Sequence, residues 1–97
     1  MDFEVVEVRY TGDYNLWLRF KDGTEGPFDC LPELRGPVFQ PLRDIAYFAR
    51  VRVNPELGTI SWPNDADLSP VYLHEFVRVA AWAADRARLV ADTAATP

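Results

Sequence analysis

Three elements meet in the stretch Ile60-Ser61-Trp62-Pro63-Asn64-Asp65-Ala66-Asp67-Leu68-Ser69-Pro70. Ile60 and Trp62 alternate as in a β-strand, with both side chains on the same face. The polar residues that follow favour a turn. Ser69 and Pro70 are a typical helix start, because the serine hydroxyl can accept from an unpaired amide and proline at the first helical position gives up no needed donor. The stretch therefore predicts a strand, a turn and the beginning of a helix.

The helix that begins at Pro70 is predicted to reach about residue 90, which leaves residues 91–97 as a frayed tail. Apolar residues recur along one side of it at helical spacing, and we expect this stripe to face the core. Its members are Leu73, Phe76, Val77, Ala80, Ala84 and Ala87.

The opposite side of this helix is also apolar. Trp82 lies opposite the stripe, with Leu89 beside it and Val79 on the flank. Such a side indicates either a helix enclosed within the monomer or an interface with another protein. The interface is favoured, because a tryptophan ring can bury about 200 Å² and is typical of binding hot spots. The expected partner-binding residues are Trp82, Leu89, Val79 and Arg86.

The N-terminal third predicts an antiparallel three-stranded meander over residues 3–10, 14–21 and 24–28. The first strand is expected to place Val6, Val8 and Tyr10 on one face and Val5 on the other. In the second strand, one face is formed by Leu16, Leu18 and Phe20. Asp22-Gly23 predicts a two-residue hairpin turn between the second and third strands, because that turn requires φ > 0.

Prolines and Gly36 divide the next segment, so no regular element is expected in residues 29–41. Pro41 suits the first position of a short helix over residues 41–48. Apolar residues at helical spacing in and just after it are Leu42, Ile45, Ala46 and Ala49. Residues 50–53 and 59–62 then predict a second hairpin. The fold class is therefore α+β: a meander and a second hairpin packed with a short helix and one long C-terminal helix.

Composition restricts the class of protein. The 97 residues suffice for one domain, and 48% hydrophobic residues are typical of a globular chain. A net charge of −5 opposes general binding to a phosphate backbone. Cys30 is the only cysteine, which excludes an internal disulfide and suits a reducing compartment. The N-terminal residues lack the pattern of a signal peptide, and no apolar run is long enough to cross a bilayer. We expect a cytoplasmic protein.

The order of several motifs resembles the bacterial family catalogued as domain of unknown function 2442, over about residues 3–77. The motifs are Leu16-Trp17-Leu18-Arg19-Phe20-Lys21-Asp22-Gly23, Gly36-Pro37-Val38-Phe39-Gln40-Pro41-Leu42, Phe48-Ala49-Arg50-Val51, Gly58-Thr59-Ile60-Ser61-Trp62-Pro63-Asn64 and Ala66-Asp67-Leu68-Ser69-Pro70. The resemblance implies a compact α+β domain without assigned catalytic residues. Some members resemble one partner of a toxin–antitoxin-like pair, and others precede a helix-turn-helix domain. The alanine-rich continuation after Val77 departs from the family and argues against direct operator binding.

The turn residues Asn64, Asp65, Asp67 and Ser69 present oxygen atoms that could hold Ca²⁺ or Mg²⁺, but they lack the glycine and the distal glutamate of a calcium loop. Roles in the turn and the helix cap are favoured, and no metal or cofactor is expected. The residues expected to be structural are Asp22, Gly23, Trp62, Pro63, Asn64, Asp67, Ser69 and Pro70.

Two further residues have reactive side chains. His74 is expected at the surface or its boundary, since the adjacent Glu75 does not face it on a helix and a single histidine is a poor zinc site. Cys30 has no nearby base in the sequence and is expected to be a small buried residue. No nucleophile–base pair or phosphate loop is present, so an enzyme is not expected.

The sequence supports two functional hypotheses. The first is a protein-binding domain that acts through its C-terminal helix, either as an antitoxin-like partner of another small protein or as a homodimer. The alternative is a dimeric nucleic-acid-binding or regulatory domain that clusters Arg50, Arg52 and Arg78, with Trp17 available for stacking.

Overall fold

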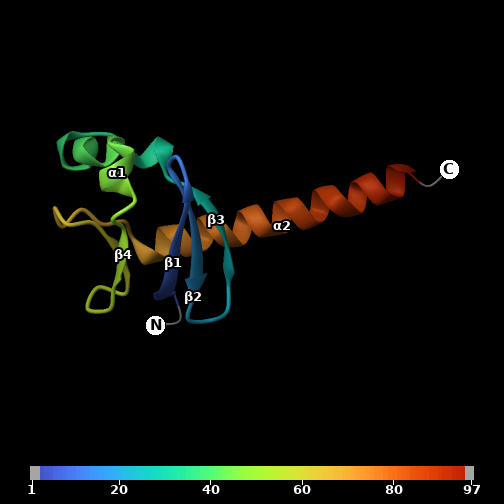
Figure 1. Cartoon of the computed structure of the whole chain (residues 1–97). Coiled ribbons are helices and arrows are strands. Elements are labelled where there is room, and N and C mark those ends of the chain that lie inside the picture. The colour runs from blue at the N-terminus through green and yellow to red at the C-terminus, as the bar shows by residue number, and fades with distance from the viewer. Residues whose placement is uncertain (1–2, 96–97) are drawn as a thin grey trace.

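The computed structural model describes the backbone of residues 3–95 and the side chains of residues 3–83 and 86. It has the predicted α+β architecture of a meander, a separate hairpin, a short helix and a long C-terminal helix (Figure 1). The elements in chain order are β1 (Val5–Gly12), β2 (Asn15–Phe20), β3 (Glu25–Asp29), the 3₁₀ helices η1 (Leu31–Glu33) and η2 (Pro37–Arg43), α1 (Ile45–Phe48), β4 (Arg52–Asn54), β5 (Thr59–Ser61) and α2 (Pro70–Ala95).

The meander has β2 at its centre, antiparallel to both neighbours. The face that alternation predicted in β2 is fully buried and consists of Leu16, Leu18 and Phe20. The prediction for β1 was wrong at its start, because Val5 pairs with Phe20 and Val8 with Leu18, which places Val5 on the same face as Val8. Val5 is buried there, whereas Val6 is 41% exposed. A β-bulge between Val5 and Glu7 inserts one extra residue, and this reverses the alternation at that point.

The hairpin between β2 and β3 is confirmed, but its loop holds three residues rather than two. The Phe20 amide donates to the Thr24 carbonyl at 2.8 Å, and the Gly23 amide donates to the Phe20 carbonyl at 2.9 Å. Gly23 has φ 91°, which glycine adopts without steric cost. Asp22 accepts from the Thr24 amide at 2.9 Å and so fixes the turn.

The outer strand β3 contains Pro27 opposite Trp17. Backbone hydrogen bonds join Phe20 to Thr24 and Tyr14 to Cys30. In an antiparallel pair every second residue is hydrogen-bonded, so Gly26 and Phe28 also direct their amides toward β2. Pro27 falls between those positions, and its nitrogen lies on the outer edge of the sheet. A proline is tolerated there because no ladder donor is lost.

The proline-rich segment is more regular than predicted, because η1 and η2 both form within it. Short 3₁₀ helices tolerate prolines at their first positions. Pro41 lies inside η2 and does not start α1, which Asp44 caps by accepting from the Ala46 amide at 3.2 Å. Of the apolar set predicted at helical spacing here, Leu42 is buried, while the buried side chain of α1 is Phe48.

The stretch from Ile60 to Pro70 joins the second hairpin to α2 as predicted. Ile60 and Trp62 are buried, and Trp62 Nε1 donates to the Phe48 carbonyl at 2.9 Å. Asn64 shapes the turn, because its Oδ1 accepts from the Ala66 amide and its Nδ2 donates to the Val38 carbonyl. Pro63 lies within the same turn, and Asp67 forms an isolated bridge with Ser61.

The start of α2 has the predicted cap. Ser69 Oγ accepts from the Tyr72 amide at 3.3 Å, and Pro70 is the first helical residue. The preceding Leu68 carbonyl accepts from Thr59 Oγ1 at 2.6 Å, which ties the end of the turn to β5. The direction in which α2 leaves the turn is thus fixed by hydrogen bonds on both sides of the cap.

Candidate protein-binding site

The first turns of α2 pack against the meander. Leu73 and Val77 are buried, and Phe76 meets Phe28 of β3 edge-on, with ring centroids 4.9 Å apart. Gly26 of β3 permits this approach, because a Cβ there would lie 3.1 Å from Val77 Cγ1. The absence of a side chain at Gly26 therefore allows the helix to pack this closely against β3.

His74 attaches the same turns to the β2–β3 hairpin. Its Nε2 lies 2.7 Å from Asp22 Oδ2, and its ring packs against Phe3 and Phe20 with centroids 4.5 and 5.0 Å away. The prediction of a surface or boundary histidine was wrong, since the residue is only 7% exposed. The Thr24 amide and then His74 hold the pKa of Asp22 below its ordinary value of 3.8.

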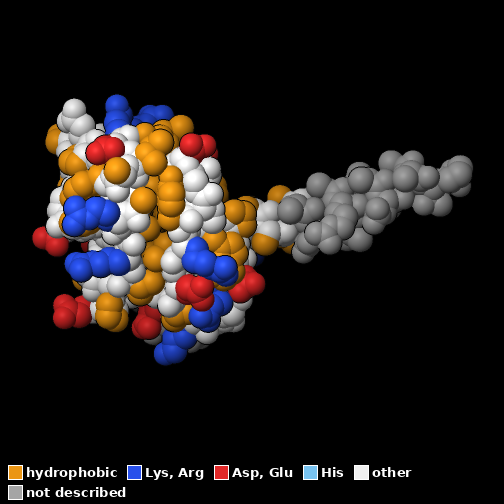
Figure 2. Space-filling model, in the orientation of Figure 1, with side chains coloured by type: hydrophobic (Ala, Val, Ile, Leu, Met, Phe, Trp, Pro, Cys, Tyr) orange, Lys and Arg blue, Asp and Glu red, His pale blue; other side chains and the backbone are white. Residues whose placement is uncertain are grey.

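Beyond Val77, α2 projects from the domain (Figure 1). Apolar side chains, orange in Figure 2, lie where the helix emerges. The predicted core stripe is wrong for Phe76, which is 42% exposed, and for Ala80, which is also exposed. Ala84 and Ala87 lie outside the described side chains. The reason is geometric. A helix of 26 residues is about 39 Å long, whereas three strands span only about 10 Å between the outer two.

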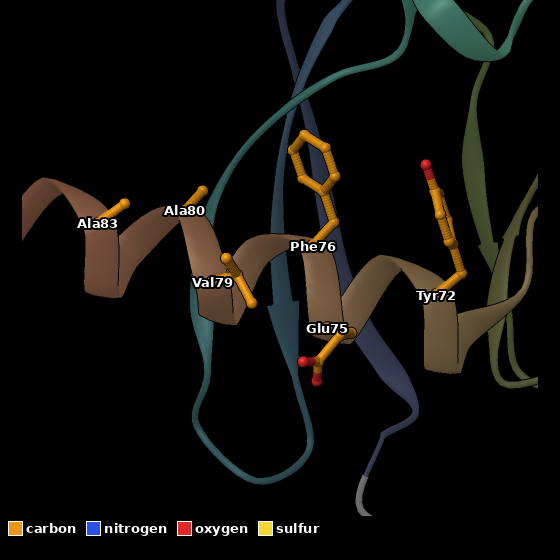
Figure 3. A pocket seen from close by; sticks show the side chains of 6 residues that line it. All are labelled: Tyr72, Glu75, Phe76, Val79, Ala80 and Ala83. Carbon is orange, nitrogen blue, oxygen red and sulfur yellow. The ribbon is translucent and has the colours of Figure 1, made fainter.

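An apolar hollow of about 450 Å³ lies along the emerging part of α2 (Figure 3). Its lining residues are Tyr72, Glu75, Phe76, Val79, Ala80 and Ala83. At its N-terminal end the Tyr72 hydroxyl donates to Glu33 Oε1 at 2.6 Å, and this bond raises the pKa of Tyr72. The small alanines leave the other end open. The hollow can therefore accept an apolar side chain from outside the domain.

Of the predicted partner-binding residues, Val79 lines this hollow, and Trp82 and Arg86 follow it along the helix. Trp82 is 59% exposed and Val79 is 45% exposed, so the helix is not enclosed within the monomer at these positions. The Arg86 guanidinium lies 5.5 Å from the centroid of the Trp82 ring. The side chain of Leu89 is outside the described residues.

Charged residues continue along this part of the helix. Arg78 Nη2 lies 2.5 Å from Glu75 Oε1, and this pairing lowers the pKa of Glu75 and raises that of Arg78. Both side chains are more than half exposed, so the pair contributes little to stability. It leaves Glu75 on the surface next to the apolar hollow.

Two of the three arginines of the nucleic-acid hypothesis, Arg50 and Arg78, are engaged in separate contacts. Arg78 pairs with Glu75, while Arg50 lies 5.7 Å from the ring centroid of Tyr47. Trp17 is half-buried beneath Arg9, whose guanidinium is 4.1 Å from the ring centroid. These contacts do not assemble a basic surface around an open aromatic ring, so no specific observation favours this alternative.

The other candidate reactive groups occupy structural positions. Cys30 is buried as predicted, and burial raises the pKa of its thiol to about 12. Among the described residues, no group of three or more His, Cys, Asp and Glu side chains could hold a metal ion. Within the same part of the chain, no helix has the length and apolar character needed to cross a membrane.

Sequence reasoning missed Tyr72 and Phe76 as members of the exposed surface. Helical periodicity placed Phe76 with the core residues, because it shares a side with Leu73 and Val77. The signal that could have found them is length. A predicted helix of residues 70–90, about 30 Å long, overruns a small three-stranded sheet, so only part of its stripe can be covered.

A comparison with protein families matches residues 5–78 to the family described as Protein of unknown function (DUF2442). The matched segment ends one residue after Val77, the last described residue of α2 that is buried. Comparisons with curated proteins and with solved structures found no significant match. Since the match covers most of the chain, this protein belongs to the DUF2442 family of unknown function.

Proposed function

We propose that this chain is a non-enzymatic protein-binding domain that acts through the projecting part of α2. The observation that carries the proposal is the exposure of Trp82 and Val79 on a helix segment that has left the sheet. Removing such side chains from water yields about 25 cal/mol per Å² of apolar surface, and tryptophan is enriched among residues that dominate binding energy. The domain holds the helix, and the helix presents the binding surface.

The more specific form of this proposal is an antitoxin-like cytoplasmic partner of another small protein. The net charge of −5 supports it, because an acidic surface attracts basic partners and suppresses non-specific contact with nucleic acid. The resemblance of some family members to one half of such a pair points the same way. The geometry of α2 supports protein binding in general and is compatible with either a different protein or a second copy.

The test compares two charge substitutions at exposed apolar residues. Trp82→Glu changes the proposed surface, and Leu57→Glu is the control, because Leu57 is 54% exposed in the turn between β4 and β5. Each tagged variant and the parent chain are purified from the native cells, followed by light scattering and mass spectrometry of the eluate. We expect Trp82→Glu alone to lose a stoichiometric protein or self-association. Equal association of all three chains would contradict the proposal.

A further inference from the structure

We propose that the protein bound on α2 is a second copy of this chain, in an antiparallel pair of α2 helices. This inference rests on the proposed function and names the occupant of the same surface. It is carried by the self-complementary order of four exposed residues along one side of the helix. We call these residues the α2 stripe: Glu75, Val79, Trp82 and Arg86.

The α2 stripe forms one side of the helix. Its residues follow one another at intervals of four, three and four positions, the spacing that keeps side chains on a common side. By the same periodicity, Leu73 and Val77, which face the sheet, lie on the opposite side. A second helix can therefore lie along the stripe without displacing the domain from its own helix.

A two-fold axis between Val79 and Trp82 makes this order complementary to itself. In an antiparallel pair centred there, Glu75 of each copy faces Arg86 of the other, and Val79 faces Trp82. An acidic end therefore meets a basic end twice, with the apolar pairs between them. Homodimer interfaces of this kind use the same patch on both subunits, which requires such an order.

The hollow beside the stripe supplies room for the larger side chain. Trp82 of the second copy lies across Val79. The small side chains of Ala80 and Ala83 leave space there for the tryptophan ring. Among the side chains that the structure describes, Arg86 lies over the Trp82 ring, and Glu75 pairs with the exposed Arg78. Pairing buries the two rings, while the charges select the orientation, because a parallel pair would set Glu75 against Glu75 and Arg86 against Arg86.

Reciprocal charge reversal tests this arrangement with the full chain. The parent chain is expected to be a dimer by light scattering and sedimentation over a concentration series. Glu75→Arg and Arg86→Glu each place two like-charge contacts in the pair, and each is expected to raise the dimer dissociation constant about tenfold. An equimolar mixture of these two variants restores opposite charges at both ends, as does the double variant. Both are expected to regain the parent affinity.

Two controls keep the result specific. Leu57→Glu should leave the dimer unchanged, and Trp82→Glu should weaken it by at least tenfold while circular dichroism shows an unchanged fold. A monomeric parent chain, or a dimer in which the mixture recovers nothing, overturns the second-copy inference. A different outcome is a monomeric parent chain that captures a different protein, with that capture abolished by Trp82→Glu. In that case only the second-copy inference fails, and the proposed function stands.

Discussion

Both parts of α2 are rich in apolar residues, but their surroundings differ. Leu73 and Val77 are 0% and 1% exposed, whereas Val79 and Trp82, a few residues later, are 45% and 59% exposed. Apolar residues in the first part stabilise the fold, and those in the second part remain available for binding. Helical periodicity separates Trp82 from Leu73 and Val77, because Trp82 lies on the opposite side of the helix, but it groups Ala80 with the two buried residues. Ala80 is nevertheless exposed, because the sheet beneath the helix is too narrow to reach it.

The largest expected difference between the two parts is in stability. Leu73→Ala removes a fully buried side chain and should lower the free energy of unfolding by about 3 kcal/mol. Val79→Ala removes an exposed one and should change it by less than about 0.5 kcal/mol in the separated monomer. Urea unfolding at low protein concentration measures both. Similar costs at the two positions would show that the second part of α2 is also packed within the domain.

A smaller effect is expected where the helix approaches the sheet most closely. Gly26→Ala adds a Cβ 3.1 Å from Val77 Cγ1 and should destabilise the fold by about 1 kcal/mol. In a Val77→Ala background this cost should largely disappear, because the opposing methyl group has been removed. A double-mutant cycle in urea measures the coupling. Independent costs would mean that the sheet and helix do not meet at this point.

The smallest effect is a pH dependence at the contact between Asp22 and His74, which attaches the packed part of α2 to the β2–β3 hairpin. The pKa of Asp22 is lowered in the folded state, so its contribution to stability is present above the ordinary value of 3.8 and is lost as pH falls through the lower folded value. The urea midpoint of the parent chain should therefore fall more steeply with acid than that of Asp22→Asn. Parallel curves for the two chains would remove the link between Asp22 and the attachment of α2.

Local signals in the sequence predicted much of the fold. Alternation identified the buried face of β2, and the pair Ser69-Pro70 located the start of α2, because these patterns depend on neighbours along the chain. The bulge after Val5 and the burial of His74 had no such signal. The first depends on pairing with β2, and the second on Asp22, which is 52 positions away.

The candidate site was predicted only in part, because one of its features follows from local spacing and another depends on distant parts of the chain. The side of α2 that carries Trp82 was readable from helical spacing, and the structure leaves Trp82 exposed. The hollow next to it was not predictable. It forms where the side of the helix that was expected to be buried extends past the sheet, so that Phe76 touches Phe28 but remains 42% exposed. Finding it requires the relative dimensions of helix and sheet, which no single segment of sequence contains.

Pro27 has a consequence for how copies of this chain can associate. An outer strand with free amides invites strand addition by another chain, a common route to uncontrolled aggregation. An added strand would need an amide donor at the middle of the outer edge of β3. Pro27 occupies that position, and its nitrogen carries no hydrogen to donate. The sheet therefore ends at β3. Association along that edge is discouraged, and contact between chains is directed to side-chain recognition on the helix.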